Sequence, residues 1–243
     1  MSARDVRRAL LLAALFAGPA ALPAADVEIA RFSSAPEGVE VPPGWAPLAF
    51  RNVPRHTTYR TVTEDGTVVV RADADSAASG LVFKLTADAK SRPVLRWRWK
   101  VADVVARSDP SRKSGDDYAA RIYVTFERPP GETPFLERAA RAIYGRDLPH
   151  SGINYIWATT GTVDSVLSNA YTDRLRMIVV ESGTSKAGRW VEEERDVYAD
   201  YRKAFGTDPP PISGIAIMTD TDNTGSRATA WYGDVSLRAN AAR

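Results

Sequence analysis

Hydrophobic and polar residues alternate along much of this chain, with the period of two that is typical of strands buried on one face. Gly, Pro and Asp residues separate the alternating segments, as turns between strands require. We therefore predict ten strands, at residues 27–32, 59–63, 67–72, 80–85, 94–101, 117–127, 153–158, 174–181, 212–219 and 228–237. Two helices are expected at residues 134–144 and 192–205, because each segment ends at a glycine, Gly145 or Gly206.

The predicted strands extend over nearly the whole sequence, without a linker-like break or an internal repeat. This distribution predicts an all-β fold: a single β-sandwich or jelly-roll domain over residues 26–243, with one or two peripheral helices. Residues 1–25 have the form of a signal peptide, since Arg4, Arg7 and Arg8 precede an apolar stretch at 9–17. We expect cleavage near residue 25 and a periplasmic location. No later stretch reaches the ~20 apolar residues of a transmembrane helix.

Composition removes several classes of function. The chain has 32 Lys and Arg against 30 Asp and Glu, and the charge balances once residues 1–25 are left out, so charge gives no argument for nucleic-acid binding. Cysteine is absent, which excludes thiol catalysis, thiolate metal sites and disulfides. Neither of the two histidines has zinc-site spacing, and no Gly-x-Ser-x-Gly, phosphate-loop or dinucleotide motif is present.

Three predicted strands carry cations on their polar face. In 95–101 the odd positions are apolar and the even ones cationic, and 117–127 and 174–179 alternate in a similar way. The candidate ligand-binding residues are Arg96, Arg98, Lys100, Asp117, Arg121, Tyr123, Arg174 and Arg176. If these strands are neighbours, their cations share one surface and need acidic partners or an anionic ligand. The surface is either a solvated, salt-bridged face or a binding face.

Two turns are rich in aspartate. Asp220, Asp222 and Thr224 occupy alternate positions before Gly225, which resembles the start of a calcium loop. The twelfth position is Trp231 rather than Glu, so an EF-hand is excluded, and the alternatives are a structural Ca²⁺ site or a self-capped β-turn. Asp116 and Asp117 form the second turn, where the alternatives are a structural and a catalytic role.

The six tryptophans divide by position. We expect Trp97, Trp99 and Trp157 in the core from their strand parity, and Trp45 at one end of the sandwich. Trp231 stands near the Asp-rich turn, where an aromatic ring serves equally to stack on a sugar or to fill the end of a sandwich.

Five ordered blocks resemble the bacterial domain of unknown function 3047 family. They are Val94–Lys100, Gly115–Arg121, Asn154–Trp157, Asp196–Tyr201 and Asp220–Thr224, spread over about residues 30–238. The resemblance implies an exported protein and supplies no activity and no catalytic residue. A looser likeness, from Ile215–Ile217 and Trp231–Leu237, is to galactose-binding-type jelly rolls, including carbohydrate-binding modules.

Three functional hypotheses follow. The first is a non-catalytic protein that binds a carbohydrate or another envelope polymer, with an acidic glycan as the preferred ligand. The second is a glycan hydrolase or lyase that uses Asp116 or Asp117. The third is a scaffold that binds another protein of the cell envelope through the same face.

Overall fold

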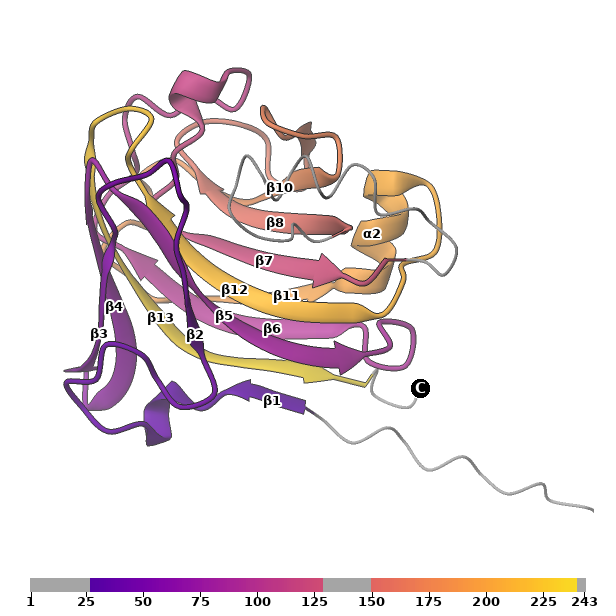
Figure 1. Cartoon of the computed structure of the whole chain (residues 1–243), viewed down its shortest axis with the longest axis horizontal. Coiled ribbons are helices and arrows are strands. Elements are labelled where there is room, and N and C mark those ends of the chain that lie inside the picture. Colours follow the sequence, from indigo (N-terminus) through magenta and orange to yellow (C-terminus); the bar gives the residue numbers. More distant parts are fainter. Residues whose placement is uncertain (1–26, 129–149, 240–243) are drawn as a thin grey trace, which may run out of the picture.

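Strands dominate the computed structural model, which describes residues 27–128 and 150–239 (Figure 1). Sheet A has the order β11 (Val191–Asp196), β6 (Val94–Val101), β13 (Arg227–Arg238), β4 (Thr67–Asp75), β3 (Thr58–Glu64), with β1 (Val27–Ala30) also on β13. Sheet B has the order β2 (Ala46–Leu48), β5 (Ala78–Ala87), β12 (Ile212–Asp220), β7 (Arg121–Phe126), β8 (Ser151–Ala158), β10 (Leu175–Ser182), β9 (Val166–Ser168). Among these pairs only β8 and β10 are parallel. The all-β sandwich prediction is confirmed.

The two sheets face each other across one apolar core. Trp97, Trp99 and Trp157 are at most 3% exposed within it, as their parity predicted. Trp97 packs on Trp99 with ring centroids 5.4 Å apart, and Trp99 reaches across to Trp157 of sheet B at 5.9 Å. Trp45 is also buried and packs against Phe32, the first residue of the short 3-10 helix η1 (Phe32–Ser34).

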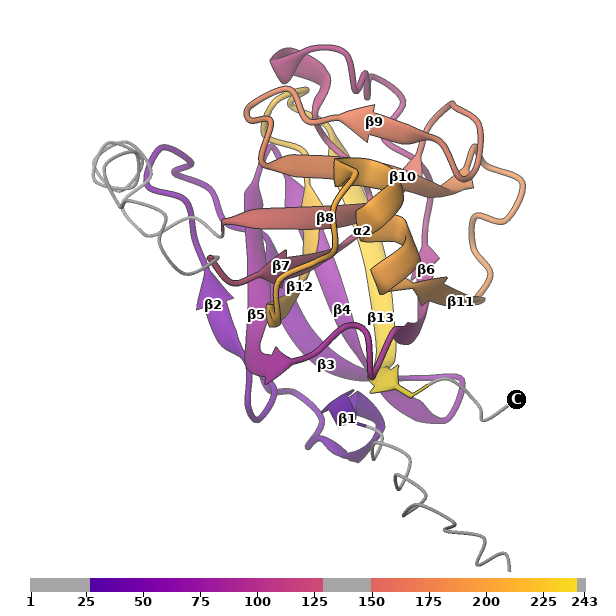
Figure 2. The same cartoon turned by 90° about the vertical axis from the view of Figure 1, so that its right-hand side faces the viewer.

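Helix α2 (Val197–Phe205) covers one open end of the sandwich (Figure 2). Its Tyr201 packs on Phe126 of β7 with centroids 4.5 Å apart. The prediction of a helix over 192–205 is wrong for its first part, since Val191–Asp196 pairs with β6 as an edge strand. The acidic run at 192–194 therefore belongs to a strand rather than to a helix N-terminus. The predicted signal peptide and the helix at 134–144 lie outside the described residues.

A second apolar cluster lies on the outer face of sheet B. It contains Tyr118, Ile156, Ala158, Met177 and Val179. Alternation in the predicted strands 117–127 and 174–181 gives Tyr118, Met177 and Val179 an apolar face, but these three residues do not belong to the main core. Alternation shows which residues share one face of a strand. It does not show whether an apolar face packs in the main core or in a second cluster on the other side of the sheet.

The expectation that six cations share one surface is also wrong. Strand β6, which carries Arg96, Arg98 and Lys100, lies in sheet A, whereas β7 and β10 lie in sheet B. Arg176 pairs with the core residue Ile153, so it lies on the core-facing side, and its guanidinium stands over Phe205 at 5.4 Å. No helix in the described part of the chain is long and apolar enough to cross a membrane.

Candidate functional site

One polar cluster is built around Arg121, at the end of sheet B away from α2. β7 begins at Arg121 and β12 ends at Asp220, and because these strands are antiparallel neighbours the two residues meet. The Arg121 Nε donates to Asp220 Oδ1 at 2.8 Å, and its Nη1 donates to Asp116 Oδ1 at 3.3 Å and to the Tyr123 hydroxyl at 3.2 Å. The Tyr118 ring lies 4.4 Å from the guanidinium.

Burial makes this cluster an internal ion-pair network. Arg121 is 1% exposed, Asp220 2% and Asp116 4%. Burial raises the pKa of Asp220 above its ordinary value, and the nearby Arg121 guanidinium opposes that shift. Burial also raises the pKa of Asp116, again against the influence of Arg121. The guanidinium thus offsets the charge of two carboxylates that water does not reach.

Asp117 fastens the neighbouring Asp-rich loop. Its Oδ1 accepts the backbone N–H of Asn223 at 3.2 Å, and its Oδ2 accepts that of Thr224 at 2.6 Å. The side chain of Asn223 donates to Asp117 at 3.1 Å and accepts from the Tyr171 hydroxyl at 2.6 Å. Asn169 donates to Asp116 at 3.4 Å. Sequence reasoning missed Asn169 and Tyr171, because no local pattern indicates that a loop 50 residues away folds onto this turn.

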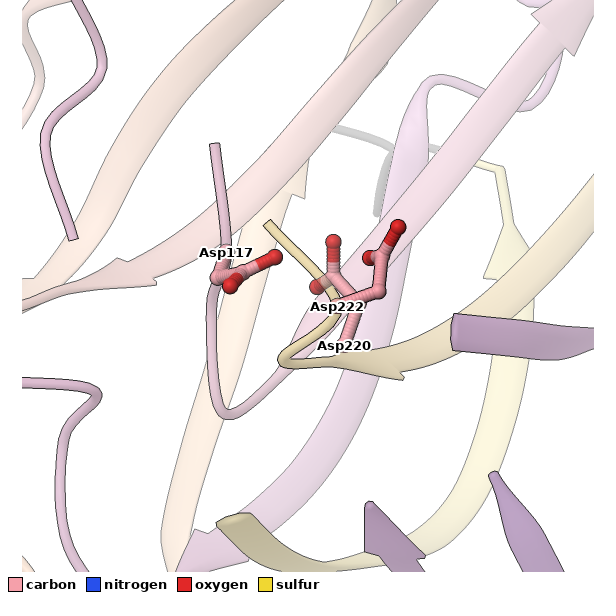
Figure 3. Close-up of side chains that lie close together, drawn as sticks. All are labelled: Asp117, Asp220 and Asp222. Atoms are coloured by element: carbon pink, nitrogen blue, oxygen red, sulfur yellow. The ribbon is translucent and has the colours of Figure 1, made fainter. Parts of the chain in front are cut away.

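Three carboxylates converge here: Asp117, Asp220 and Asp222 each place an oxygen within 4.8 Å of the others (Figure 3). The third member of this group is therefore Asp117 and not Thr224, the residue that the sequence predicted as a metal ligand. The Thr224 hydroxyl instead donates to Ser226 at 2.8 Å. Burial and the nearby Asp117 raise the pKa of Asp222. A structural Ca²⁺ at this turn stays a prediction, and melting temperatures in Ca²⁺ and in EDTA would test it.

The outer face of sheet A carries a groove of about 730 Å³. The register places Glu28, Ser236, Arg96 and Glu194 side by side on β1, β13, β6 and β11. Arg98 and Glu192 form the next row along β6 and β11. Arg31, Ser33 and Ser34, at the η1 helix, complete one wall. The groove thus has a floor of alternating charges and hydroxyls.

Two tryptophans extend this surface. Trp190 and Trp231 are both half-buried. The Arg98 guanidinium lies 4.7 Å from the Trp190 ring, and the Lys100 ammonium lies 5.4 Å from Trp190 and 4.4 Å from Trp231. Trp231 pairs with Lys100 across β13 and β6, so these residues share the outer face. Aromatic rings and cations therefore alternate beyond the end of the groove.

The predicted ligand-binding residues thus divide between two places. Arg96, Arg98 and Lys100 lie along the groove and tryptophans of sheet A, whereas Asp117, Arg121 and Tyr123 lie in or beside the buried cluster of sheet B. Arg174 follows the loop that carries Asn169 and Tyr171 and joins neither set. Trp190, Glu28 and Glu192 were not predicted. Trp190 precedes the acidic run, but only the pairing of β11 with β6 places it beside Arg98.

Comparison with known proteins identifies a family. The family described as Protein of unknown function (DUF3047) matches residues 43–236, and the chain belongs to it. No curated protein matches the chain.

Solved structures with low similarity include the family 11 carbohydrate-binding module of cellulosomal cellulase Lic26A-Cel5E of Clostridium thermocellum, at 8% identity and a TM-score of 0.44, covering 90% of this chain and 97% of that one. The xyloglucanase domain of NopAA from Sinorhizobium fredii has 11% identity and a TM-score of 0.44, over 90% and 100%. Endoglucanase 3 of Trichoderma harzianum has 7% identity and a TM-score of 0.43, over 89% and 97%. At these values the likenesses say nothing about what this chain binds.

Proposed function

We propose that this member of the DUF3047 family is an exported, non-catalytic protein that binds a carbohydrate polymer of the cell envelope along the outer face of sheet A. The observation that carries the proposal is the placement of Trp190 and Trp231 on the face that also holds the charged groove. The ring face that a cation leaves uncovered packs against the apolar C–H face of a sugar ring, while the neighbouring charges reach the hydroxyls. The Trp190 indole N–H donates to Asp65 at 3.1 Å, which holds that ring in place.

The shape of the surface supports a polymer rather than a single sugar. Arg96, Arg98 and Lys100 are alternate residues of β6, so they span ~13 Å along the strand, and the groove also crosses from β1 to β11. Its volume lies within the ~300–1,000 Å³ of ordinary ligand sites. Hydroxyl acceptors, donors and aromatic faces repeat along this length, as repeating sugar units require.

Catalysis by Asp116 or Asp117 has less support. Asp116 is ion-paired with Arg121, and Asp117 is fully buried with both oxygens bonded to the 223–224 backbone. These contacts favour a structural role, because a catalytic carboxylate must reach the substrate.

Affinity electrophoresis of the mature protein against a panel of neutral and acidic polysaccharides tests the proposal. We expect retardation by at least one polysaccharide, and loss of it in a variant that combines Trp190→Ala and Trp231→Ala. Tyr171→Ala is the matched aromatic control, because Tyr171 is 42% exposed and lies beside the Asp-rich loop. Retardation lost in Tyr171→Ala and kept in the double variant would refute the site. Retardation by no polysaccharide would refute the function.

Two further experiments address the remaining parts of the proposal. Cell fractionation and N-terminal sequencing of the mature protein test export to the periplasm. Capture from envelope extracts tests the scaffold alternative, with the double Trp variant as the control for binding through this face.

A further inference from the structure

Arg98 differs from the other two cations of β6. Arg96 pairs with Glu194, and Lys100 pairs with Glu64 of β3. Within residues 27–128 and 150–239, the Arg98 side chain forms no ion pair and donates no hydrogen bond. Its guanidinium instead lies over the Trp190 ring, 4.7 Å from the centroid. A group with five N–H donors therefore stands in the groove with those donors unused.

The backbone holds Arg98 in this position. Gly233 lies at an irregularity of β13, where the pairing with β6 shifts between Tyr232 and Val235. A Cβ atom at Gly233 would lie 2.5 Å from both Cγ and Nε of Arg98, so the side chain lies directly across the glycine. Gly233 on one side and Trp190 on the other thus restrict the guanidinium before any ligand arrives, which lowers the entropic cost of binding.

The charge of the groove limits which anions fit. Its lining contains four arginines, at 31, 96, 98 and 238, and four acidic residues, at 28, 192, 194 and 234, besides Glu193, whose carboxyl accepts the Trp99 indole N–H instead. A densely sulfated or phosphorylated polymer would be repelled by so many carboxylates. A glycan with one carboxylate per sugar places one charge at a cation and leaves its hydroxyls for the acids. The carboxylates of Glu28 and Glu192 accept no hydrogen bond within the described residues, so they are available for those hydroxyls.

We infer that the ligand of this groove is a carboxylate-bearing glycan, a polyuronate, and that Arg98 binds its carboxylate through two parallel N–H donors. The inference rests on the proposed function, because it names the substrate class of the same surface. Planar guanidinium and carboxylate groups match in geometry, and such paired hydrogen bonds are stronger than those between neutral groups. Trp190 supports the guanidinium from below, and its ring leaves the donor edges free.

Isothermal titration of the mature protein with two polymers of one backbone tests the inference. Polygalacturonate carries the carboxylate, and fully methyl-esterified polygalacturonate lacks its charge. We expect the wild type to bind the acid at least tenfold more tightly than the ester. Arg98→Gln should abolish that difference by lowering the affinity for the acid toward that for the ester. Arg98→Lys keeps the charge without the planar fork, so it should recover only part of the preference.

Two more variants separate recognition from general charge. Gly233→Ala keeps Arg98 but displaces it, so it should lose the preference for the acid, and its melting temperature reports the cost of that displacement to the fold separately. Arg60→Gln is the matched control, since it removes an exposed cation from β3 of the same sheet, and it should change nothing.

The outcomes distinguish a failure of this inference from a failure of the proposed carbohydrate binding. Equal binding of acid and ester, or a preference that persists in Arg98→Gln, overturns the inference and leaves polymer binding intact. If the protein binds neither polymer but is retained on a neutral glycan in a way that depends on Trp190, the inference is likewise overturned and polymer binding is left intact. Binding of no glycan at all refutes both.

Discussion

Arg121 is the residue on which the polar cluster of sheet B depends. It is the cation that faces Asp116 and Asp220, and all three side chains are buried. Removing one partner of a buried ion pair leaves an uncompensated charge in a medium that solvates it poorly. The strand pattern placed Arg121 on the polar face of its strand, and its pairing with Ile156 does put it on the outer face of sheet B, but it is buried there among Asp116, Tyr118 and Asp220.

We predict that Arg121→Ala lowers the free energy of unfolding by about 3–5 kcal/mol. Urea denaturation followed by tryptophan fluorescence measures the change. Arg60→Ala serves as the control, because its exposed pair with Glu40 at 3.9 Å should contribute less than ~1 kcal/mol. A loss in Arg121→Ala no larger than in Arg60→Ala would show that the buried network is not structural.

Glu193 is the second residue with a measurable consequence. It lies at the seam of the sandwich, where its Oε1 accepts the Trp99 indole N–H at 3.2 Å. Burial and the nearby Glu181 raise the pKa of Glu193 from 4.5 to about 7. Between about pH 4.5 and pH 7, Glu193 therefore keeps its proton in the folded protein and releases it in the unfolded chain. The stability that Glu193 contributes is complete below about pH 4.5 and is lost as the pH rises through about 7.

We predict that the free energy of unfolding falls from pH 5 to pH 8, and that Glu193→Gln reduces this slope because the amide does not ionise. Chemical denaturation at both pH values measures the slope. Glu192→Gln is the matched control, since Glu192 is the exposed neighbour on the opposite face of β11. The same slope in wild type and Glu193→Gln would contradict the assignment.

At the scale of elements, helix α2 shows how single residues fix the two ends of a helix. The Asp196 side chain accepts the Ala199 N–H at 2.8 Å, and Gly206 ends the helix with a φ of 75°. We predict that Asp196→Ala costs about 1 kcal/mol of stability, measured by denaturation. Asp208→Ala, at an exposed position after the helix, should cost less than half as much. Equal losses would mean that the cap is not stabilising.

The same segment shows where sequence patterns fail. The C-terminal glycine predicted the end of α2, because a left-handed cap needs a glycine locally. The acidic run before it was assigned to the helix, although pairing with β6 makes it a strand. Trp97, Trp99 and Trp157 were predicted correctly, since strand parity is local. The division of the cations between two sheets depends on pairings such as Trp231 with Lys100, more than 100 residues apart, which no local period encodes.

At the scale of the whole molecule, both sheets contribute to one core. Trp97 and Trp99 of sheet A pack on Tyr155 and Trp157 of sheet B, and α2 adds Val197 and Tyr201 to the same apolar cluster. Neither sheet keeps its inner face covered if the other unfolds. Each outer face therefore carries its own polar residues without disturbing the shared interior.

We therefore predict one cooperative unfolding transition for residues 26–243, with far-UV circular dichroism and tryptophan fluorescence changing together. Trp97→Ala should lower the stability by about 3–5 kcal/mol, because it opens a cavity between the sheets. It should shift both signals equally. Resolved transitions, or a Trp97→Ala shift confined to one signal, would mean that the sheets unfold separately. If the sheets unfolded separately, the groove on sheet A would lose its shape while the Arg121 cluster of sheet B stayed folded. The coupling between the two sheets therefore also decides whether a ligand bound to one face stabilises the other.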